Sequence, residues 1–255
     1  MSYQNIEVSF ENGLGTITLK RPPMNVLNIA LLTDINQALG AWIGNKDLKV
    51  VLFKSREKCF SAGADITELN GDQVFLLIKA FLDMFRNIER LGCLTAASVH
   101  GMCFGGGCEL TVWCDLVIAA EGTKISVPEV KIGMFPPIAA YIMPRIIGRK
   151  AAFELILSGK TITADEACKI GLVSKVVKDE DLEQETAEFL KPYLKLSAEV
   201  LRLAKKAIDT GMKEDLEARL KGIEERSFKE LLMTHDSHEG LTAFLEKRKP
   251  EWRNE

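Results

Sequence analysis

Two glutamates and two glycine turns are the parts of this sequence best suited to chemistry. Glu109 follows three consecutive glycines in the segment HGMCFGGGCELTVWCD, where a strand is predicted to turn into a helix. Glycines let backbone N–H groups approach a ligand closely, and a helix N-terminus adds positive potential, so this segment can hold an oxyanion. The alternative also stays open, in which the glycines only allow close packing and Glu109 complements the helix dipole.

The segment CFSAGADITEL contains a second glycine turn between a strand and a helix. The backbone N–H of Ala64 in this turn is a candidate second donor. Two such turns in one α/β unit suggest an oxyanion hole with two donors. The loss of one such donor typically costs about 3–4 kcal/mol of transition-state stabilisation.

Glu129 lies in a third segment, KISVPEVKIGMFPP, directly after a predicted strand and a proline. Taken alone, it is more simply a solvated residue at the start of a helix. A partner such as Glu109 changes this interpretation. Two carboxylates aimed at one site can act as base and proton donor if their surroundings separate their pKa values.

Other catalytic arrangements fit the sequence poorly. The three histidines, His100, His235 and His238, have no metal-binding spacing, so no metal site is predicted. His100 ends an apolar strand and is expected to be hydrogen-bonded in the core. No GxSxG or GxGxxG motif is present, which disfavours a serine nucleophile and hydride transfer from a dinucleotide.

Composition predicts one large domain in a reducing compartment. The chain has 255 residues, of which 47% are hydrophobic and 27% charged, and its net charge of −3 gives no reason to expect a nucleic-acid partner. The first ten residues lack the features of a secretory signal, and no apolar run approaches the roughly 20 residues that span a membrane. The six cysteines form no CxxC pair and are predicted to be buried, reduced thiols, which indicates the cytoplasm.

Strands and helices are predicted to alternate through the first 148 residues, which is typical of an α/β fold. A second helix is expected to bury Phe75, Ile78, Leu82 and Phe85. The first helix is predicted from Ile29 to Trp42. The predicted strands are Gly15 to Lys20, Lys49 to Phe53, Leu94 to Val99, Asp115 to Ala120, Lys124 to Val127 and Ser174 to Val177.

The sequence after Gly148 is predicted to be almost entirely helical. Thr163 and Glu166 form a capping box at one helix start, and the residues from Lys213 to Leu232 form a long charged amphipathic helix. This part looks suited to packing or assembly rather than to chemistry.

The three segments together resemble the crotonase, or enoyl-CoA hydratase/isomerase, superfamily. FSAGADI, HGMCFGGGCELTVWCDLVIAA and VPEVKIGMFP match its pattern in order and spacing, as do SGKTITADEACKIGLVSKVV and EGLTAFLEKRKPEW. The resemblance covers essentially the whole chain. It implies an α/β spiral of ββα turns over residues 1–195 and a C-terminal helical trimerisation region over residues 196–255, with assembly into homotrimers or homohexamers.

The resemblance also implies roles for individual residues. The backbone N–H groups of Ala64 and Gly106 would polarise a thioester carbonyl, while Glu109 and Glu129 would be the catalytic acid and base. Because both glutamates are present, addition of water to an α,β-unsaturated coenzyme A thioester is expected. Glu129 is predicted to donate the proton to carbon, and Glu109 to hold and activate water.

Further residues are implied to bind the substrate. Phe244 and Lys247 would reach the adenine and phosphate end from a neighbouring subunit, although Lys247 is equally well explained as part of a solvated basic tail. No metal or redox cofactor is implied, since coenzyme A is part of the substrate. The remaining implied substrate contacts are Met24, Val26, Ala62, Asp65, Ile66 and Pro136.

Two departures from common straight-chain enzymes bear on the substrate. The segment RPPMN lacks the lysine that often follows Arg-Pro, and FPPIAA replaces a more glycine-rich stretch beside the acyl group. Both resemble the branch that hydrates cyclohexa-1,5-diene-1-carbonyl-CoA in the degradation of aromatic acids. A short-chain enoyl-CoA hydratase of β-oxidation and a double-bond isomerase are the alternatives. An RNA-binding scaffold, reported among relatives, is disfavoured by the negative charge and the two glutamates.

Overall fold

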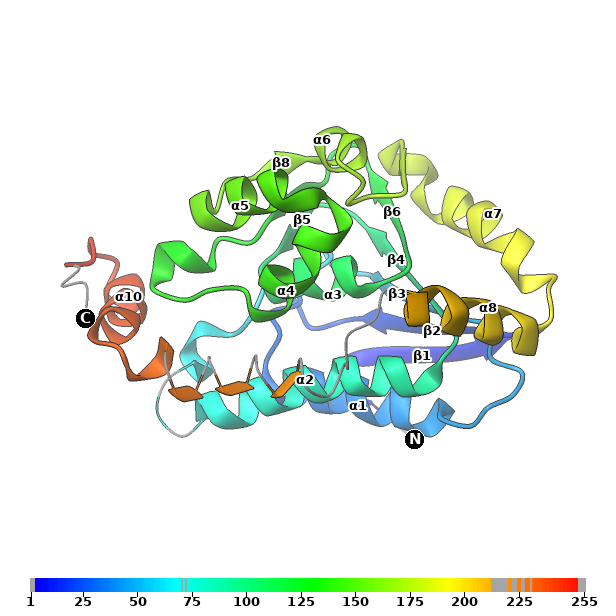
Figure 1. Cartoon of the computed structure of the whole chain (residues 1–255), viewed down its shortest axis with the longest axis horizontal. Coiled ribbons are helices and arrows are strands. Elements are labelled where there is room, and N and C mark those ends of the chain that lie inside the picture. The colour runs from blue at the N-terminus through cyan, green and yellow to red at the C-terminus, as the bar shows by residue number, and fades with distance from the viewer. Residues whose placement is uncertain are drawn as a thin grey trace.

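A computed structural model describes residues 3–69, 71, 73–211, 220–221, 224–225, 228–229 and 231–251 of the chain. Its centre is a six-stranded sheet with the strand order β1-β2-β3-β4-β6-β9, in which only β1 and β2 pair in the antiparallel direction. Figure 1 shows helices on both sides of this sheet. The strands of the large sheet are β1 (Ile6–Glu11), β2 (Leu14–Leu19), β3 (Val50–Ser55), β4 (Leu94–Val99), β6 (Leu116–Ala120) and β9 (Lys175–Val177).

Alternating apolar side chains explain why the large sheet is covered on both faces. In β3, Val51 and Phe53 face the main core against helices α1 (Ile29–Trp42) and α2 (Gln73–Leu91), while Val50 and Leu52 pack with Leu190 of α7. Because both faces of β3 are buried, its residues from Val50 to Phe53 form a continuous apolar run.

A smaller sheet and a series of short helices complete the fold. The strands β5, β7 and β8 form the smaller sheet, which continues directly into the segments that carry the two glutamates. The remaining elements are β5 (Met102–Phe104), α3 (Gly106–Trp113), β7 (Lys124–Ser126), η2 (Glu129–Ile132), α4 (Pro137–Ile146), α5 (Gly148–Ser158), β8 (Ile162–Thr163), α6 (Ala164–Lys169), η3 (Asp179–Asp181), α7 (Leu182–Leu194), α8 (Ala198–Gly211), η5 (Leu231–Met233) and α10 (His235–Leu245), with η1 (Ile66–Glu68) between β3 and α2.

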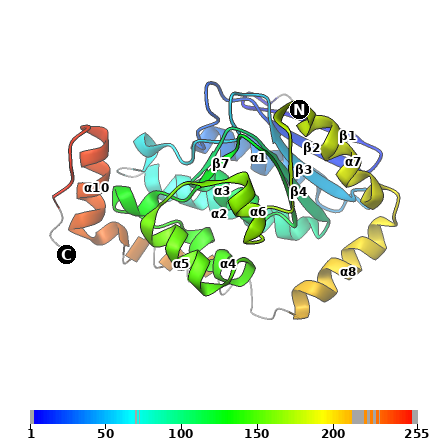
Figure 2. The same ribbon diagram turned by 90° about the horizontal axis from the view of Figure 1, so that it is seen from above.

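Helices α8 and α10 lie at opposite ends of the molecule, as both views show (Figures 1 and 2). An ion pair between Lys205 and Asp115 ties α8 to the sheet. At the other end, α10 packs on η2, where a Cβ on Gly240 would lie 2.5 Å from the carbonyl of Ile132. Among the described residues, no helix combines the length and the apolar character needed to cross a membrane.

Most of the predicted elements are confirmed. The helix from Ile29 to Trp42 and the strand from Leu94 to Val99 have the predicted bounds, and the capping box of Thr163 and Glu166 is present. His100 is hydrogen-bonded as predicted, through Nε2 to the carbonyl of Glu57 at 2.8 Å. All six cysteines are free thiols, five of them buried.

Three expectations differ from the structure or fall outside it. The strands β1 and β5 were not predicted, since β1 carries mostly exposed side chains and β5 has only three residues, directly before the three consecutive glycines. Phe75 is 47% exposed rather than buried, because it lies on the outer side of α2 against Phe228. Most of the predicted helix from Lys213 to Leu232 lies outside the described residues.

Candidate active site

A cavity of about 360 Å³ lies between the two glycine turns and the helices α1, α2 and α10. Its wall is mostly apolar, with Leu32, Phe81 and Phe135 among the side chains that line it. Glu109 and Glu129 are the two carboxyl groups in this wall. A mainly apolar cavity with a few convergent polar groups is the usual form of a small-molecule site.

Glu109 lies in the first turn of α3 and is 2% exposed. Its Oε1 accepts hydrogen bonds from the backbone N–H groups of Ile138 at 2.7 Å and Ala139 at 2.9 Å, at the start of α4. Pro136 and Pro137 lead into α4, so the first free N–H groups of this helix are the two that hold Glu109. Burial raises the pKa of Glu109 to about 7, although the two hydrogen bonds oppose this rise.

Glu129 begins η2 and has the opposite surroundings. Its Oε2 is buried and has no hydrogen-bond partner within the described part of the chain. Burial, and then repulsion by the charge of Glu109, raise the pKa of Glu129 well above its ordinary value. Both carboxyl groups are thus shifted toward their protonated forms, but in Glu109 two hydrogen bonds to the ionised form offset part of the effect of burial.

Ala64 lines the cavity, and its backbone N–H is not used in the pairing of its loop. Residue 64 forms a parallel bridge with Leu27, in which Leu27 donates to Gly63 at 2.7 Å and accepts from Asp65 at 2.9 Å. In this pattern, the N–H of Ala64 points away from residue 27. No acceptor for it lies among the residues that the structure describes.

Gly106 presents the second donor, as the first residue of α3. The N–H groups in the first turn of a helix have no partner within the helix. A Cβ on Gly106 would lie 3.1 Å from Leu27 and 3.3 Å from Phe81, so glycine allows both side chains to close on this backbone.

Ser61 holds together two donor loops, which are residues 62–65 around Ala64 and residues 105–107 around Gly106. Its backbone N–H donates to Met102 at 3.1 Å, and its carbonyl accepts from Phe104 at 3.0 Å. A Cβ on Gly107 would lie only 2.5 Å from the Cβ of Ser61. The spacing of the Ala64 and Gly106 donors is therefore fixed by direct contacts between their loops.

The structure brings part of the predicted site together. The predicted residues Ala62, Ala64, Ile66, Gly106, Glu109, Glu129 and Phe244 all line the cavity. Phe244 reaches it from its own chain, on α10, whereas the resemblance implied a neighbouring subunit. The roles of these residues in binding and catalysis remain predictions.

Five of the predicted substrate contacts lie outside the cavity wall. Asp65 is turned toward Arg21, while the carbonyl groups of Met24 and Val26 accept hydrogen bonds from within the protein. Pro136 is buried at the start of α4, and Lys247 is exposed beyond α10. Contacts of these five with the coenzyme A part of a substrate stay predictions.

Several residues that shape the site were not identified as site residues from the sequence. Phe81 and Leu32 belong to helices whose apolar spacing indicated only core packing. Asn25 is fully buried and hydrogen-bonded behind the donor loop, although an asparagine after two prolines indicates only a turn.

Comparison with known proteins agrees with this fold. The family model described as enoyl-CoA hydratase/isomerase matches residues 9–255. The chain is 36% identical to a crotonyl-CoA hydratase of Syntrophomonas wolfei, covering 98% of each chain. It is 31% identical to a cyclohexa-1,5-dienecarbonyl-CoA hydratase of Thauera aromatica, covering 96% of this chain and 94% of that protein.

A solved structure of an enoyl-CoA hydratase from Mycobacterium avium subsp. paratuberculosis has the same fold. It superposes with a TM-score of 0.85 at 27% identity, over 99% of this chain and 100% of that one. The family match covers nearly the whole chain, and its α/β fold is the one observed here. The chain therefore belongs to the enoyl-CoA hydratase/isomerase family.

Proposed function

We propose that this protein adds water to the α,β double bond of an unsaturated coenzyme A thioester. One observation supports this most strongly: Glu109 and Glu129 line the same cavity as the loops of Ala64 and Gly106. Such a cavity offers two donors for a carbonyl oxygen and two carboxyl groups with different surroundings. Hydration needs all four groups, whereas an isomerase requires only one active carboxylate.

In the proposed mechanism, the thioester oxygen accepts hydrogen bonds from the N–H groups of Ala64 and Gly106. These bonds draw electron density from the conjugated double bond, so that its β-carbon becomes electrophilic. Ionised Glu109 removes a proton from water as the oxygen bonds to the β-carbon. Protonated Glu129 delivers a proton to the α-carbon, which completes the addition. No metal or redox cofactor takes part, and coenzyme A is part of the substrate.

We propose a compact cyclic acyl group as the first candidate, cyclohexa-1,5-diene-1-carbonyl-CoA. The support is the stiff wall formed by Phe135 and Pro137 together with Phe81. A short straight-chain enoyl-CoA is the second candidate, since the 36% identical relative is named a crotonyl-CoA hydratase. The first would serve the degradation of aromatic acids, and the second β-oxidation.

Turnover of the two thioesters by the purified protein, measured side by side, tests the acyl group. Efficient hydration of the cyclic diene with slow hydration of crotonyl-CoA is the expected result. Faster turnover of crotonyl-CoA would overturn the cyclic assignment and leave the hydratase function intact. No hydration of either would contradict the function itself.

A homotrimer or a homohexamer is also proposed, assembled through the helical region of residues 196–255. The support is the apolar surface on and before α8, where Leu196, Val200, Leu203 and Ile208 are each more than half exposed. Such a surface is normally covered by another protein surface. A cytoplasmic location is proposed from the six free cysteines, which suit a reducing compartment.

A further inference from the structure

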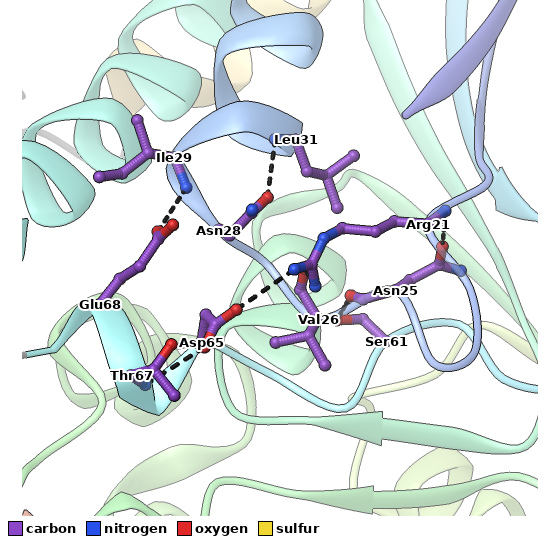
Figure 3. A network of polar contacts seen from close by, with 10 residues as sticks. All are labelled: Arg21, Asn25, Val26, Asn28, Ile29, Leu31, Ser61, Asp65, Thr67 and Glu68. Atoms are coloured by element: carbon purple, nitrogen blue, oxygen red, sulfur yellow. Dashed lines mark hydrogen bonds and ion pairs between the residues drawn. The ribbon is translucent and has the colours of Figure 1, made fainter. Parts of the chain in front are cut away.

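The side chain of Arg21 joins the donor loop of Ala64 to the segment 24–27 that pairs with this loop. Its Nη1 donates to the carbonyl of Val26 at 3.0 Å, and its Nη2 lies 3.3 Å from Oδ2 of Asp65 (Figure 3). The side chains of Arg21 and Asp65 are 28% and 18% exposed. The guanidinium group is thus directed into the protein, toward the residue that directly follows Ala64.

The backbone pairing beside this ion pair sets the direction of the Ala64 N–H. Ala62 donates to Met24 at 3.0 Å, Leu27 donates to Gly63, and Asp65 donates to Leu27. The segment 24–27 therefore acts as a short parallel strand for the donor loop. If the two segments shift relative to each other, the Ala64 donor moves with them.

Asn25 fixes the other side of the same segment. It has a positive φ of 47° and is fully buried. Its side-chain oxygen accepts from the backbone N–H of Arg21 at 2.8 Å, and its amide nitrogen donates to Ser55 Oγ at 2.7 Å. Its carbonyl accepts from Ser61 Oγ at 2.7 Å. The backbone from which the Arg21 side chain extends is therefore held in place.

A second carboxylate holds the far end of the donor loop. Glu68 accepts a hydrogen bond from the N–H of Ile29 at 2.7 Å, at the start of α1 (Figure 3). The loop between β3 and α2 is thus attached at Asp65 and at Glu68. Only the Asp65 attachment is an ion pair directly beside the donor.

We propose that Arg21 and Asp65 are positioning residues for the oxyanion hole. Arg21 bridges Val26 and Asp65, and so holds the two paired segments in the register that directs the Ala64 N–H into the cavity. This inference rests on the proposed function, since it assigns these residues a role in polarising the thioester carbonyl.

The chain offers a matched control for a substitution at Arg21. Like Arg21, Arg202 bonds backbone carbonyl oxygen and a carboxylate, although it has two carbonyl partners where Arg21 has one: Nη1 donates to Leu48 at 3.2 Å, Nη2 to Lys46 at 2.9 Å and Nε to Glu199 at 3.3 Å. Its side chain is 21% exposed, close to the value for Arg21, and it does not line the cavity. Arg21→Met and Arg202→Met therefore remove similar contacts, but only one of them lies behind a proposed donor.

The test compares Arg21→Met, Asp65→Asn, the double variant and Arg202→Met with the unchanged protein. The probe is a coenzyme A thioester of 4-(dimethylamino)cinnamic acid, whose absorption shifts to longer wavelength when its carbonyl is polarised. We expect Arg21→Met and Asp65→Asn to reduce this shift and to lower kcat about 10- to 100-fold, with KM changed less than about threefold. The double variant should resemble Arg21→Met, because the contact between Arg21 and Asp65 is already lost in that single variant.

The control separates positioning from stability. Arg202→Met should lower the melting temperature about as much as Arg21→Met, yet keep the full absorption shift and kcat. A full shift and normal kcat in folded Arg21→Met would overturn the inference while the proposed function stands. No shift and no hydration with the unchanged protein would instead refute the proposed function.

Discussion

Glu129 lies so close to Gly105 that a Cβ on Gly105 would be 2.9 Å from Oε1 of the glutamate. Gly105 also has a positive φ of 50°, and its N–H donates to Ser126 at 2.9 Å. The glycine that turns the chain into α3 therefore also makes room for the second carboxyl group. This contact joins the glycine-rich segment before α3 to the proline-containing segment that carries Glu129.

Replacement of Gly105 by alanine is expected to displace Glu129. The new methyl group would meet Oε1, and the positive φ would add strain. We expect a loss of kcat of about 100-fold or more, because a small misplacement of a catalytic group is costly. The measurement is steady-state turnover of the better of the two thioesters.

The control for this change is Gly40→Ala. Gly40 lies within α1 and has nothing within 4 Å of an added Cβ, so alanine there should raise stability by about 1 kcal/mol and leave kcat unchanged. Equal activity of the two alanine variants would contradict the packing of Glu129 against Gly105.

Replacement of either proposed catalytic carboxyl group should abolish most activity. Glu109→Gln keeps an oxygen that can accept from Ile138 and Ala139 but cannot act as a base, and Glu129→Gln cannot deliver an acidic proton. We expect each to lower kcat by about 100- to 10,000-fold, in the range of general acid–base catalysis. Binding of a saturated acyl-CoA, measured by calorimetry, should change little.

Glu89→Gln is the matched control for these two variants. Glu89 is a half-buried carboxyl group with a pKa raised by burial, but it accepts a hydrogen bond from Trp113 at 3.0 Å and does not line the cavity. Activity should persist in this variant. If Glu109→Gln or Glu129→Gln turned over as fast as Glu89→Gln, the role proposed for that residue would be wrong.

The value of kcat/KM should fall on both the acidic and the alkaline side of an optimum pH. The pKa of Glu109 is raised to about 7 by burial, so kcat/KM should fall as the pH drops through that value and the base is protonated. Burial, and then repulsion by the charge of Glu109, raise the pKa of Glu129 well above its ordinary value, so kcat/KM should also fall on the alkaline side as this proton donor ionises. Both limbs report the pair of carboxyl groups as a unit. A profile that is flat on the acidic side would contradict the role of Glu109.

The buried carboxyl groups should also make stability depend on pH. Glu109 has a folded pKa of about 7, above its ordinary value of 4.5, so folding favours its protonated form. This contribution is complete below the unfolded pKa and is lost as pH rises through about 7, and a shift of this size corresponds to about 3 kcal/mol. Glu109→Gln should therefore melt higher than the unchanged protein at about pH 8, with a smaller gain at about pH 5. The same gain at both pH values would contradict the burial of an ionisable group.

The segments that carry the chemistry could be predicted because their chemistry is local. Glycines before a helix leave N–H groups free, and Glu109 in the first turn of α3 follows directly from that pattern. The strand from Leu94 to Val99 and the helix from Ile29 to Trp42 were also predictable, since their apolar periodicity matches their burial. The residues alone offered Glu109 and Glu129 as a candidate pair, and the resemblance to a family assigned the two glutamates their roles.

The contacts that fix the site depend on tertiary packing and could not be predicted. Arg21 and Asp65 are 44 residues apart, and nothing in their spacing indicates that they form an ion pair beside a proposed donor. Likewise, Phe81 lies on a helix whose pattern predicts a core position, yet it forms the cavity wall opposite Gly106. These relationships arise only when the donor loop pairs with the segment 24–27.

Incorporation of solvent oxygen tests the central claim most directly. The protein is incubated in ¹⁸O-labelled water with crotonyl-CoA and, in parallel, with cyclohexa-1,5-diene-1-carbonyl-CoA, and the products are analysed by mass spectrometry. Hydration predicts one labelled oxygen in the product from at least one of the two thioesters, formed at least about 100-fold more slowly with Glu109→Gln. A product with a shifted double bond and no label would contradict the proposed hydratase function and identify an isomerase.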